Sequence, residues 1–280
     1  MYLLFDIGGS KMRLAISKGG KKLDAIKTIA TPQNFQTAVL EFKKLALELS
    51  HGMAIKVAAG GVAGPLDEKL TQITNAPNLP HWNNKPLKKE LEENIGTPVY
   101  LENDAAVAGL GEAVMGAGKK NKIVAYLTIS TGVGGTRIID GQIDRNALGF
   151  EPGHQIIDPT NTLCPDCRPP GYLENLISGS SLEHRFQKKP IAIADPQVWE
   201  QLAEWLAFGI NNTIVHWSPE IVILGGPMIW GNPAINIERV RYHLKNICTI
   251  FPELPVVTTA ELKDTAGLQG ALILAKRLKK

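Results

Sequence analysis

The segment Phe5-Asp6-Ile7-Gly8-Gly9-Ser10-Lys11 decides how the fold is interpreted, because it joins two short apolar runs at residues 2–5 and 12–16. Both runs are typical of strands, and a glycine pair can adopt backbone angles closed to other residues, so the pattern predicts a tight β-hairpin. The turn would present backbone N–H groups, the Ser10 hydroxyl, the Lys11 cation and the Asp6 carboxylate, which could hold a metal-bound water. We interpret it as a site for the phosphates of a nucleotide–Mg2+ complex; an ordinary surface hairpin is the alternative.

A second glycine-rich turn, Thr131-Gly132-Val133-Gly134-Gly135, strengthens this interpretation. It too lies between apolar runs, at residues 123–129 and 138–139. Two hydroxyl-bearing glycine turns far apart in the sequence predict two similar domains that face each other across a nucleotide. A Rossmann or P-loop site is not indicated, because those motifs need a helix to start after the glycines, whereas here a strand continues.

Composition narrows the class of protein. A chain of 280 residues with 44% hydrophobic side chains can fill the cores of two domains. The formal charge of +3 comes from scattered lysines, so neither a nucleic acid nor a membrane surface is an expected partner. The apolar start is too short for a signal peptide, and no apolar run approaches the roughly 20 residues of a membrane span. Three cysteines, an odd number, indicate a reducing compartment rather than a disulfide framework, and we expect a cytoplasmic protein.

Apolar periodicity predicts four longer helices. They cover residues 34–50, 195–217, 233–248 and 265–278. The clearest start is Asp195-Pro196, where an N-cap residue precedes a proline at the first helical position.

Three glycine- or proline-rich segments are expected to lie near a ligand. A buried strand at residues 54–59 runs into a turn at 60–66 whose glycines could let the backbone approach a ligand closely. The irregular loop from Asn75 to Trp82 is of the kind that carries substrate contacts. A strand at 221–224 ends in Gly225-Gly226-Pro227, a strand-to-helix corner of the sort that ligands touch.

The chemistry is predicted at Glu102-Asn103-Asp104, directly before the helical segment Ala105-Ala-Val-Ala108. Asn103 and Asp104 are favourable helix caps, and capping alone would explain them. Capping is compatible with catalysis, because a helix N-terminus keeps a carboxylate ionised. Such a carboxylate can accept a proton from an alcohol as its oxygen attacks a phosphoryl group.

Seven motifs in order give the chain a resemblance to the ROK family of sugar kinases and repressors, over nearly the whole sequence. The motifs are Asp6-Ile-Gly-Gly-Ser-Lys11, Asn75 to Trp82, Glu102-Asn-Asp-Ala105, Thr131-Gly-Val-Gly-Gly135, Glu151-Pro-Gly-His154, Leu224-Gly-Gly226 and Asp264 to Ala271. The resemblance implies an α/β fold of the actin/hexokinase-like ATPase type, with two ribonuclease-H-like domains around an interdomain cleft. The smaller domain would hold residues 1–104 with the C-terminal helix, 264–280, packing back on it, and the larger one residues 105–263.

The resemblance also implies an activity and a set of site residues. The activity is transfer of the ATP γ-phosphoryl group to a hexose hydroxyl, with Asp104 as the base. The positions that match the family's sugar contacts are Asn78, Asn103, Asp104, Glu151, His154 and Glu174. The positions that match its contacts with ATP and Mg2+ are Asp6, Gly8, Gly9, Ser10, Lys11, Thr131, Gly132, Gly225 and Gly226. A homodimer is common in such relatives.

The cysteines depart from the family's pattern. Members that resemble this chain often hold a structural zinc through the histidine of the Gly-His pair and three cysteines. Here His154 and Cys164 have the expected spacing, but the next thiol is Cys167 and Tyr172 occupies the last cysteine position. A closed tetrahedral site needs four ligands. The sequence therefore offers a possible zinc site with three ligands, His154, Cys164 and Cys167, which Asp166 or water could complete.

Several functions remain open at this stage. A glucokinase is the first interpretation, and a kinase for N-acetylglucosamine or N-acetylmannosamine is the alternative within the same class. A non-catalytic sugar-binding protein is a further alternative, against which the presence of Asp104 argues. A sugar-sensing repressor would need a DNA-binding helix-turn-helix before Asp6, where no room remains after Met1.

Overall fold

The computed structural model describes residues 1–167 and 170–277. The chain forms two compact units, each described here by itself. Unit 1 comprises residues 1–115, 145–149 and 264 onward, and unit 2 comprises residues 116–144 and 150–263.

Unit 1 is built on a five-stranded sheet with the strand order β3-β2-β1-β4-β5. The strands are β1 (Tyr2–Ile7), β2 (Lys11–Ser17), β3 (Ala25–Ala30), β4 (Val57–Val62) and β5 (Val99–Asn103). The first three strands are antiparallel neighbours, whereas β1, β4 and β5 run parallel. The predicted hairpin is therefore present, and its turn lies between β1 and β2.

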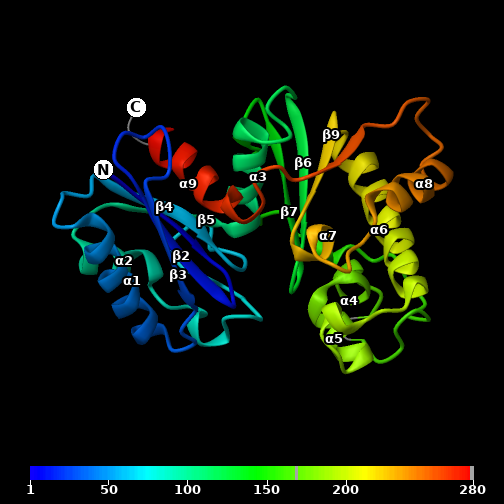
Figure 1. The fold of residues 1–280 in the computed structure, drawn as a ribbon, viewed down its shortest axis with the longest axis horizontal. Coiled ribbons are helices and arrows are strands. Elements are labelled where there is room, and N and C mark those ends of the chain that lie inside the picture. Colours follow the sequence, from blue (N-terminus) through cyan, green and yellow to red (C-terminus); the bar gives the residue numbers. More distant parts are fainter. Residues whose placement is uncertain (168–169, 278–280) are drawn as a thin grey trace. The chain divides into compact units, whose positions relative to one another are not determined.

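Helices cover both faces of the unit 1 sheet (Figure 1). They are α1 (Phe35–Ser50), α2 (Leu87–Ile95), α3 (Asp104–Met115) and α9 (Ala266–Arg277), with short 3-10 turns η1 (Pro80–Trp82) and η4 (Lys263–Thr265). Because successive side chains of a strand point to opposite faces, Leu3 and Phe5 of β1 join the apolar cluster under α1, while Leu4 joins the cluster under α9. Helix α1 begins where predicted, since the Asn34 side chain accepts a hydrogen bond from the Thr37 N–H at 3.0 Å.

Unit 2 repeats this plan on a second five-stranded sheet, with the order β10-β9-β6-β7-β8. The strands are β6 (Ile123–Ile129), β7 (Val133–Ile139), β8 (Gln142–Ile143), β9 (Ile221–Gly225) and β10 (Val256–Thr259). As in unit 1, the first three strands in sequence are antiparallel and two later strands add in parallel on the other side. The prediction of two similar α/β domains is confirmed.

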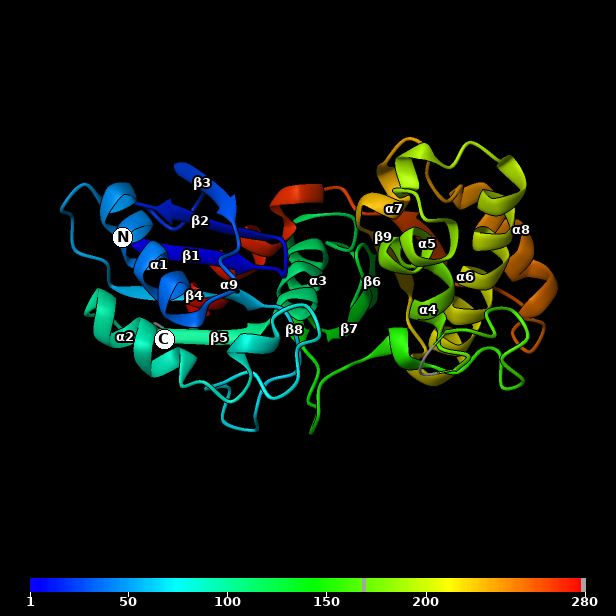
Figure 2. The same ribbon diagram turned by 90° about the horizontal axis from the view of Figure 1, so that it is seen from below.

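The helices of unit 2 bury its largest apolar cluster. They are α4 (Leu173–Ile177), α5 (Gly179–Phe186), α6 (Pro196–Trp217), α7 (Pro227–Trp230) and α8 (Ile237–Ile247), with 3-10 turns η2 (Pro152–His154) and η3 (Pro190–Ala192). Helix α6 packs along α8 and α4 (Figure 2). Its start is the predicted one, since Asp195 accepts from the Gln197 N–H at 2.9 Å.

Two elements, β4 and α8, have boundaries that differ from the sequence-based expectation. The strand expected at residues 54–59 is β4, Val57–Val62, so the Gly60-Gly61 pair lies within the sheet rather than in a turn. The helix expected from Pro233 begins at Ile237, because the Asn236 side chain caps it. Position 278, the expected end of the last helix, lies outside the described residues.

Helix α3 lies where the boundary between the two domains was expected. The sequence analysis placed that boundary after Asp104, at the start of this helix, whereas α3 packs on α9 and belongs to unit 1 as a whole. Gly111 of α3 makes this packing close: a Cβ there would lie 2.4 Å from the Ala266 carbonyl oxygen.

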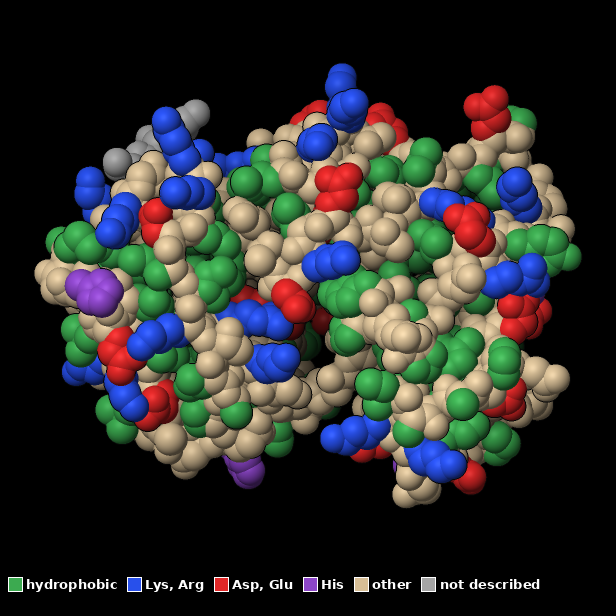
Figure 3. Space-filling model, in the orientation of Figure 1, with side chains coloured by type: hydrophobic (Ala, Val, Ile, Leu, Met, Phe, Trp, Pro, Cys, Tyr) green, Lys and Arg blue, Asp and Glu red, His purple; other side chains and the backbone are tan. Residues whose placement is uncertain are grey.

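Within residues 1–167 and 170–277, every helix is too short or too polar to cross a bilayer. On the face drawn in Figure 3, Lys and Arg side chains are scattered among acidic and hydrophobic ones.

Candidate active site

The β1–β2 turn of unit 1 is held by its own backbone and by neighbouring segments. The Gly8 N–H donates to the Lys11 carbonyl at 2.9 Å, and the Thr31 hydroxyl donates to the Gly8 carbonyl at 2.6 Å. A Cβ on Gly9 would lie 2.5 Å from the Cβ of Asn78, so the turn packs directly against the loop that carries Asn78. Glycine is thus required here for close approach, and two predicted groups, the phosphate turn and the Asn78 loop, lie together.

Asp6 is the acidic group of this turn, and it is mostly buried. Arg13, which faces it across the β1–β2 pair, donates to Asp6 Oδ2 at 2.9 Å. Burial raises the pKa of the Asp6 carboxyl, the Arg13 guanidinium acts in the opposite direction, and the Asp264 carboxylate adds to the rise. Arg13 was not predicted as part of the site, although its place opposite Asp6 follows from the hairpin register.

Asp104 is the first residue of α3, directly after β5. Its Oδ1 accepts a hydrogen bond from the Ala105 N–H at 2.8 Å. Asn103 supplies the capping contact, because its Oδ1 accepts from the Ala106 N–H at 3.1 Å, while its Nδ2 donates to the Gly64 carbonyl at 3.3 Å. The arrangement leaves Asp104 partly exposed at the positive end of a helix, where an ionised carboxylate is favoured.

Two glycines of the 60–66 segment are required by the close packing around this helix start. A Cβ on Gly61 would lie 2.7 Å from the Asp104 Cα, and one on Gly64 would lie 2.6 Å from the Ala76 Cβ. Gly64 also has a φ of +103°. These glycines allow protein segments to approach one another beside Asp104, and the approach of their backbone to a ligand stays a prediction.

In unit 2, the second glycine turn is fixed by hydrogen bonds to α5 and to a carboxylate of α4. The Ser180 hydroxyl donates to the Thr131 carbonyl at 2.6 Å, and the Gly179 N–H donates to the Ser130 carbonyl at 2.7 Å. Glu174 Oε2 accepts from the Val133 N–H at 2.7 Å, and a Cβ on Gly132 would lie 2.6 Å from the same oxygen. The Glu174 carboxylate therefore lies directly against the Thr131–Gly132 turn. Only a glycine at position 132 leaves space for it.

Glu151 and His154 complete a polar cluster with Glu174. His154 is the last residue of η2 and Glu151 directly precedes that turn. Gly153 between them packs on β7, where a Cβ would lie 2.2 Å from the Val133 carbonyl oxygen. Burial raises the pKa of Glu151; His154 lowers it and Glu174 raises it, so all three groups are within electrostatic reach. The predicted sugar contacts of unit 2 are thus brought together beside its predicted phosphate turn.

Gly225 and Gly226 form the corner between β9 and α7. A Cβ on Gly226 would lie 2.1 Å from the Ile129 carbonyl oxygen, and Gly226 has a φ of +91°. A Cβ on Gly225 would lie 2.4 Å from the Tyr126 hydroxyl. Both glycines are required by packing against β6, next to the second glycine turn.

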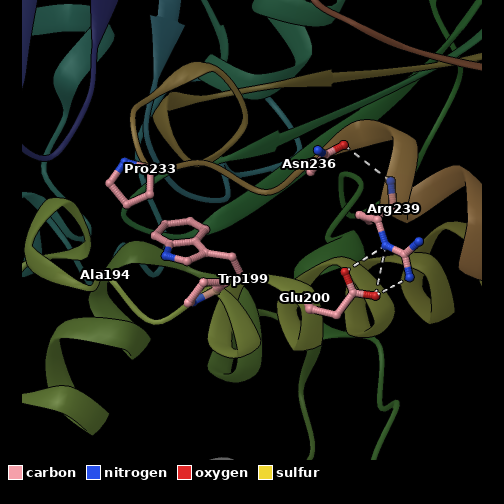
Figure 4. Close-up of a pocket in the computed structure, with 7 residues that line it drawn as sticks. Ala194, Trp199, Glu200, Pro233, Asn236 and Arg239 are labelled. Carbon is pink, nitrogen blue, oxygen red and sulfur yellow. Dashed lines mark hydrogen bonds and ion pairs between the residues drawn. The ribbon is translucent and has the colours of Figure 1, made fainter.

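A cavity of about 340 Å3 opens near this corner, between the starts of α6 and α8. Its lining consists of Ala194, Pro196, Trp199, Glu200, Pro233, Asn236 and Arg239 (Figure 4). The Arg239 guanidinium donates to both carboxylate oxygens of Glu200, at distances from 2.6 to 3.0 Å. The corner and the cavity wall are connected, because the Ile235 N–H donates to the Met228 carbonyl of α7 at 2.8 Å. The sequence analysis missed this cavity, since its residues come from distant segments.

The predicted zinc ligands do not form a metal site. Cys164 and Cys167 are joined by a disulfide, with a Cα–Cα distance of 5.4 Å, so neither offers a thiolate. His154 instead packs against the Tyr172 ring, with centroids 5.2 Å apart. Across the described ranges, which omit 168–169 and 278–280, no three His, Cys, Asp or Glu side chains are grouped to hold a metal. The residues therefore do not fit a zinc ion. The Cys164–Cys167 disulfide was not expected, because the odd number of cysteines had indicated free thiols.

The fold and the paired glycine turns define the class of protein. Two α/β units with the same strand plan, each with a glycine turn between its first two strands, have the actin/hexokinase-like ATPase fold. The chain belongs to the ROK family, whose model matches residues 2–278.

Individual relatives match over nearly their whole length. The chain is 29% identical to a glucokinase of Thermotoga maritima, over 97% of this chain and 96% of the relative. It is 28% identical to an N-acetyl-D-glucosamine kinase of Escherichia coli, over 98% and 99%. Among solved structures, a ROK family glucokinase from Streptomyces griseus in complex with glucose and AMPPNP superposes with a TM-score of 0.80 at 26% identity, over 98% of this chain and 99% of that one.

Proposed function

We propose that this protein transfers the γ-phosphoryl group of ATP to a hexose hydroxyl, most simply converting glucose to glucose 6-phosphate. The observation that carries the proposal is the place of Asp104, a carboxylate at the positive end of α3 that accepts a hydrogen bond from the Ala105 N–H. Membership of the ROK family and the similarity to a glucokinase support it.

In this proposal Asp104 is the general base. It accepts the proton of the attacking hydroxyl as the oxygen approaches the terminal phosphorus, which is how a carboxylate assists phosphoryl transfer. The Asn103 amide is oriented by its bonds to Gly64 and Ala106, so it can contact a sugar hydroxyl without a costly change of rotamer. Because a desolvated hydroxyl must be paired, Asn78 in unit 1 and the cluster of Glu151, His154 and Glu174 in unit 2 are the proposed further contacts.

The phosphates of the donor are proposed to bind at the glycine turns. The Gly8–Gly9 turn with Ser10 and Lys11, and the Thr131–Gly132 turn, present small residues and hydroxyls, and backbone N–H groups at such turns attract anions. The Gly225–Gly226 corner is the proposed neighbour of the adenosine, and the cavity beside Trp199 offers apolar walls next to it.

The turn of unit 1 fits a magnesium ion. Mg2+ is a hard cation that binds carboxylates through water, and among the described residues Asp6 Oδ1 has no hydrogen-bond donor, whereas Oδ2 is engaged by Arg13. Asp6 would hold the ion through its water shell, and the ion would neutralise charge on the β- and γ-phosphates.

A kinase for N-acetylglucosamine or N-acetylmannosamine is the second candidate, favoured by the similarity to an N-acetyl-D-glucosamine kinase. A non-catalytic sugar-binding protein is the third. All three candidate functions are compatible with membership of the ROK family. The two kinases differ in the substituent that they accept at the second carbon of the sugar, and the sugar-binding protein differs from both because it has no turnover.

A coupled assay of ADP release, run over glucose, mannose, fructose, N-acetylglucosamine and N-acetylmannosamine, tests the proposal. Glucose should give the highest kcat/KM, and NMR of the product should locate the phosphate on the primary hydroxyl. Preference for an N-acetylated sugar would establish the second candidate. Sugar binding by calorimetry without ADP release would contradict both kinases.

We also propose that the protein is a homodimer and that it is located in the cytoplasm. Light scattering tests the first proposal, and cell fractionation tests the second.

A further inference from the structure

Asp6 and Arg13 form a cross-strand ion pair directly beneath the β1–β2 turn. The two residues are opposite each other in the antiparallel register, so their side chains lie on the same face of the sheet. Arg13 Nη1 lies 2.9 Å from Asp6 Oδ2, and the side chains are only 22% and 16% exposed. The pair is therefore shielded from solvent far more than an ordinary surface ion pair.

The segment at the start of α9 contacts this ion pair through Asp264 and Gly267. Arg13 Nη2 lies 3.6 Å from Asp264 Oδ1, and the Asp264 side chain is 79% exposed. Gly267 in the first turn of α9 faces Asp6: a Cβ there would lie 2.9 Å from Asp6 Cγ and 3.0 Å from Oδ2. The Asp6 carboxylate thus lies between the Arg13 guanidinium and the backbone of Gly267, where a side chain on residue 267 would collide with it.

The two carboxylate oxygens of Asp6 are consequently unequal. Oδ2 is bound by Arg13 and covered by Gly267, whereas Oδ1 accepts no hydrogen bond from the described part of the chain. Arg13 binds Asp6 through Nη1 alone, while its Nη2 lies near Asp264, and a charge-assisted hydrogen bond of this kind favours one orientation of the carboxylate. Removing one partner of a shielded pair leaves the other charge uncompensated, so Asp6 depends on Arg13 to stay a well-oriented anion.

We propose that Arg13 is a positioning residue for the magnesium-bound phosphates: it holds Asp6 through Oδ2, directs Oδ1 toward the water shell of the ion, and links both to the start of α9 through Asp264. The inference rests on the proposed function, because it assigns a role to Arg13 within that site. Arg13 itself touches neither the sugar nor the reacting phosphorus. Partners that orient a metal-binding carboxylate typically contribute 10–100-fold to metal affinity or activity, and we expect about this effect here.

The test compares three variants with the wild type. Arg13→Met removes the charge and the donors but keeps a long side chain. Arg13→Lys restores the charge without the fork. Arg137→Met is the matched control, because Arg137 and Asp144 form a similar ion pair at 2.7 Å, with 26% and 23% exposure, on the β7 side of unit 2.

Two measurements distinguish a role of Arg13 in positioning Asp6 from a general loss of stability. The Mg2+ concentration for half-maximal turnover should rise about tenfold or more in Arg13→Met, with an unchanged KM for the hexose and partial recovery in Arg13→Lys. Calorimetric titration of ADP with and without Mg2+ should show that Arg13→Met loses the Mg2+-dependent gain in affinity while ADP alone binds as before. Arg137→Met should lower thermal stability and leave both Mg2+ readouts unchanged.

Three outcomes would overturn the inference. The first is a half-maximal Mg2+ concentration within twofold of the wild type in Arg13→Met. The second is an equal loss in Arg137→Met. The third is a parallel loss of hexose affinity, which would assign Arg13 a purely structural role. If Arg13→Met does not fold, Arg13→Lys alone decides by the same Mg2+ readouts. If the wild type releases no ADP with any sugar, the proposed function is wrong. If the wild type is active but its Mg2+ dependence is unchanged by substitution of Arg13, only the inference about Arg13 is wrong.

Discussion

At the scale of single residues, the candidate site depends on small side chains that permit close approach as much as on charged ones. Gly9 lets the Asn78 loop reach the first turn, Gly132 lets Glu174 reach the second, and Gly61 lets α3 begin beside β4. Each of these approaches brings a predicted functional residue to a defined place. Single substitutions can therefore separate the chemistry of Asp104 from the packing that positions it.

Replacing Asp104 by Asn should lower kcat by about 10²–10⁴-fold, because the amide cannot accept the proton of the attacking hydroxyl. Hexose affinity and the melting temperature should stay near the wild-type values, since Asn103 supplies the capping contact of α3. Steady-state kinetics and calorimetry check this. Asp67→Asn is the control: Asp67 accepts from Thr71 and Gln72 in a turn of unit 1, so stability should fall while kcat is retained. A near-full rate in Asp104→Asn would contradict the assignment of the base.

Gly61→Ala should destabilise the protein by about 1–3 kcal/mol, the usual range for overpacking, because the new methyl group meets the Asp104 backbone. Turnover should fall as well, since the start of α3 must shift. Denaturant unfolding and kinetics of the same preparation measure both effects. Gly19→Ala is the matched control, because nothing lies within 4 Å of a Cβ at that position. Equal stability of the two variants would show that the 60–66 segment is more adaptable than its packing indicates.

The same residues show what the sequence could predict. The two glycine turns and Asp104 were found because their signals are local: a glycine pair between apolar runs, and a carboxylate before a helix. The contacts of Arg13 with Asp264, and the cavity beside Trp199, join segments far apart in the chain, so no local pattern indicates them. The zinc prediction failed because spacing alone cannot tell two thiolate ligands from the disulfide between Cys164 and Cys167.

At the scale of elements, the starts of α1 and α6 were predicted correctly, whereas the start of α8 and the limits of β4 were not. Asn34 and Asp195 cap α1 and α6 as expected, because a capping side chain acts within three residues of the chain. Strand β4 extends through Gly60 and Gly61, which the sequence analysis placed in a turn, because pairing with β1 outweighs the low strand propensity of glycine. Tertiary context therefore decides where a strand ends.

Helices α6 and α8 are joined by Glu200, which binds both Arg239 and His243. These contacts lower the Glu200 pKa from its ordinary value of 4.5 to about 2, with the Arg239 hydrogen bond as the largest cause. A depressed carboxyl pKa stabilises the folded state above the unfolded-state value, and this stabilisation is lost as pH falls through the folded-state value. The stability difference between the wild type and Glu200→Gln should thus be constant above about pH 5 and shrink between pH 4.5 and 2.

Thermal unfolding over a pH series measures that difference. The effect should be modest, because Glu200 is 39% exposed and solvent screens the pair. Glu93→Gln provides the control, since its ion pair with Lys89 on α2 is a surface contact at 3.8 Å. A Glu200→Gln difference that persists unchanged down to pH 2 would show that Glu200 acts through packing rather than charge.

Helix α9 is the element that completes unit 1. Leu272 is 2% exposed in the apolar cluster that α9 shares with β1 and β4. Leu272→Ala should therefore lower the free energy of unfolding by about 2–5 kcal/mol. Leu40→Ala on the outer face of α1, where the side chain is 61% exposed, should cost less than about 0.5 kcal/mol. Comparable losses in chemical denaturation would contradict the packing of α9.

At the scale of the whole molecule, the two units share one strand plan, and each carries a glycine turn with acidic side chains beside it. The sequence predicted this duplication because both turns have the same signature. How the chain divides is a property of long-range contacts: unit 1 takes up residues 145–149 and the segment from residue 264, and only the second of these was expected.

A bound hexose should stabilise the whole protein against heat. Binding to the folded state alone contributes RT ln(1 + [L]/Kd), about 2.7 kcal/mol at a hundredfold excess over Kd. Differential scanning fluorimetry with rising glucose should show a progressive shift in the melting temperature, and mannitol, which lacks a pyranose ring, should give none. A shift that is equal for both would indicate a nonspecific effect of polyols. No shift with any sugar of the panel would contradict hexose binding.

The position of α9 has a consequence for synthesis on the ribosome. Asp6 is translated before unit 2, yet the backbone that faces it belongs to Gly267, and the apolar cluster on that side of the sheet needs Leu268 and Leu272. Unit 2 comprises residues 116–144 and 150–263, so its chain is translated before α9. The glycine turn between β1 and β2 therefore gains its final support only after the whole chain of unit 2 and helix α9 have been synthesised.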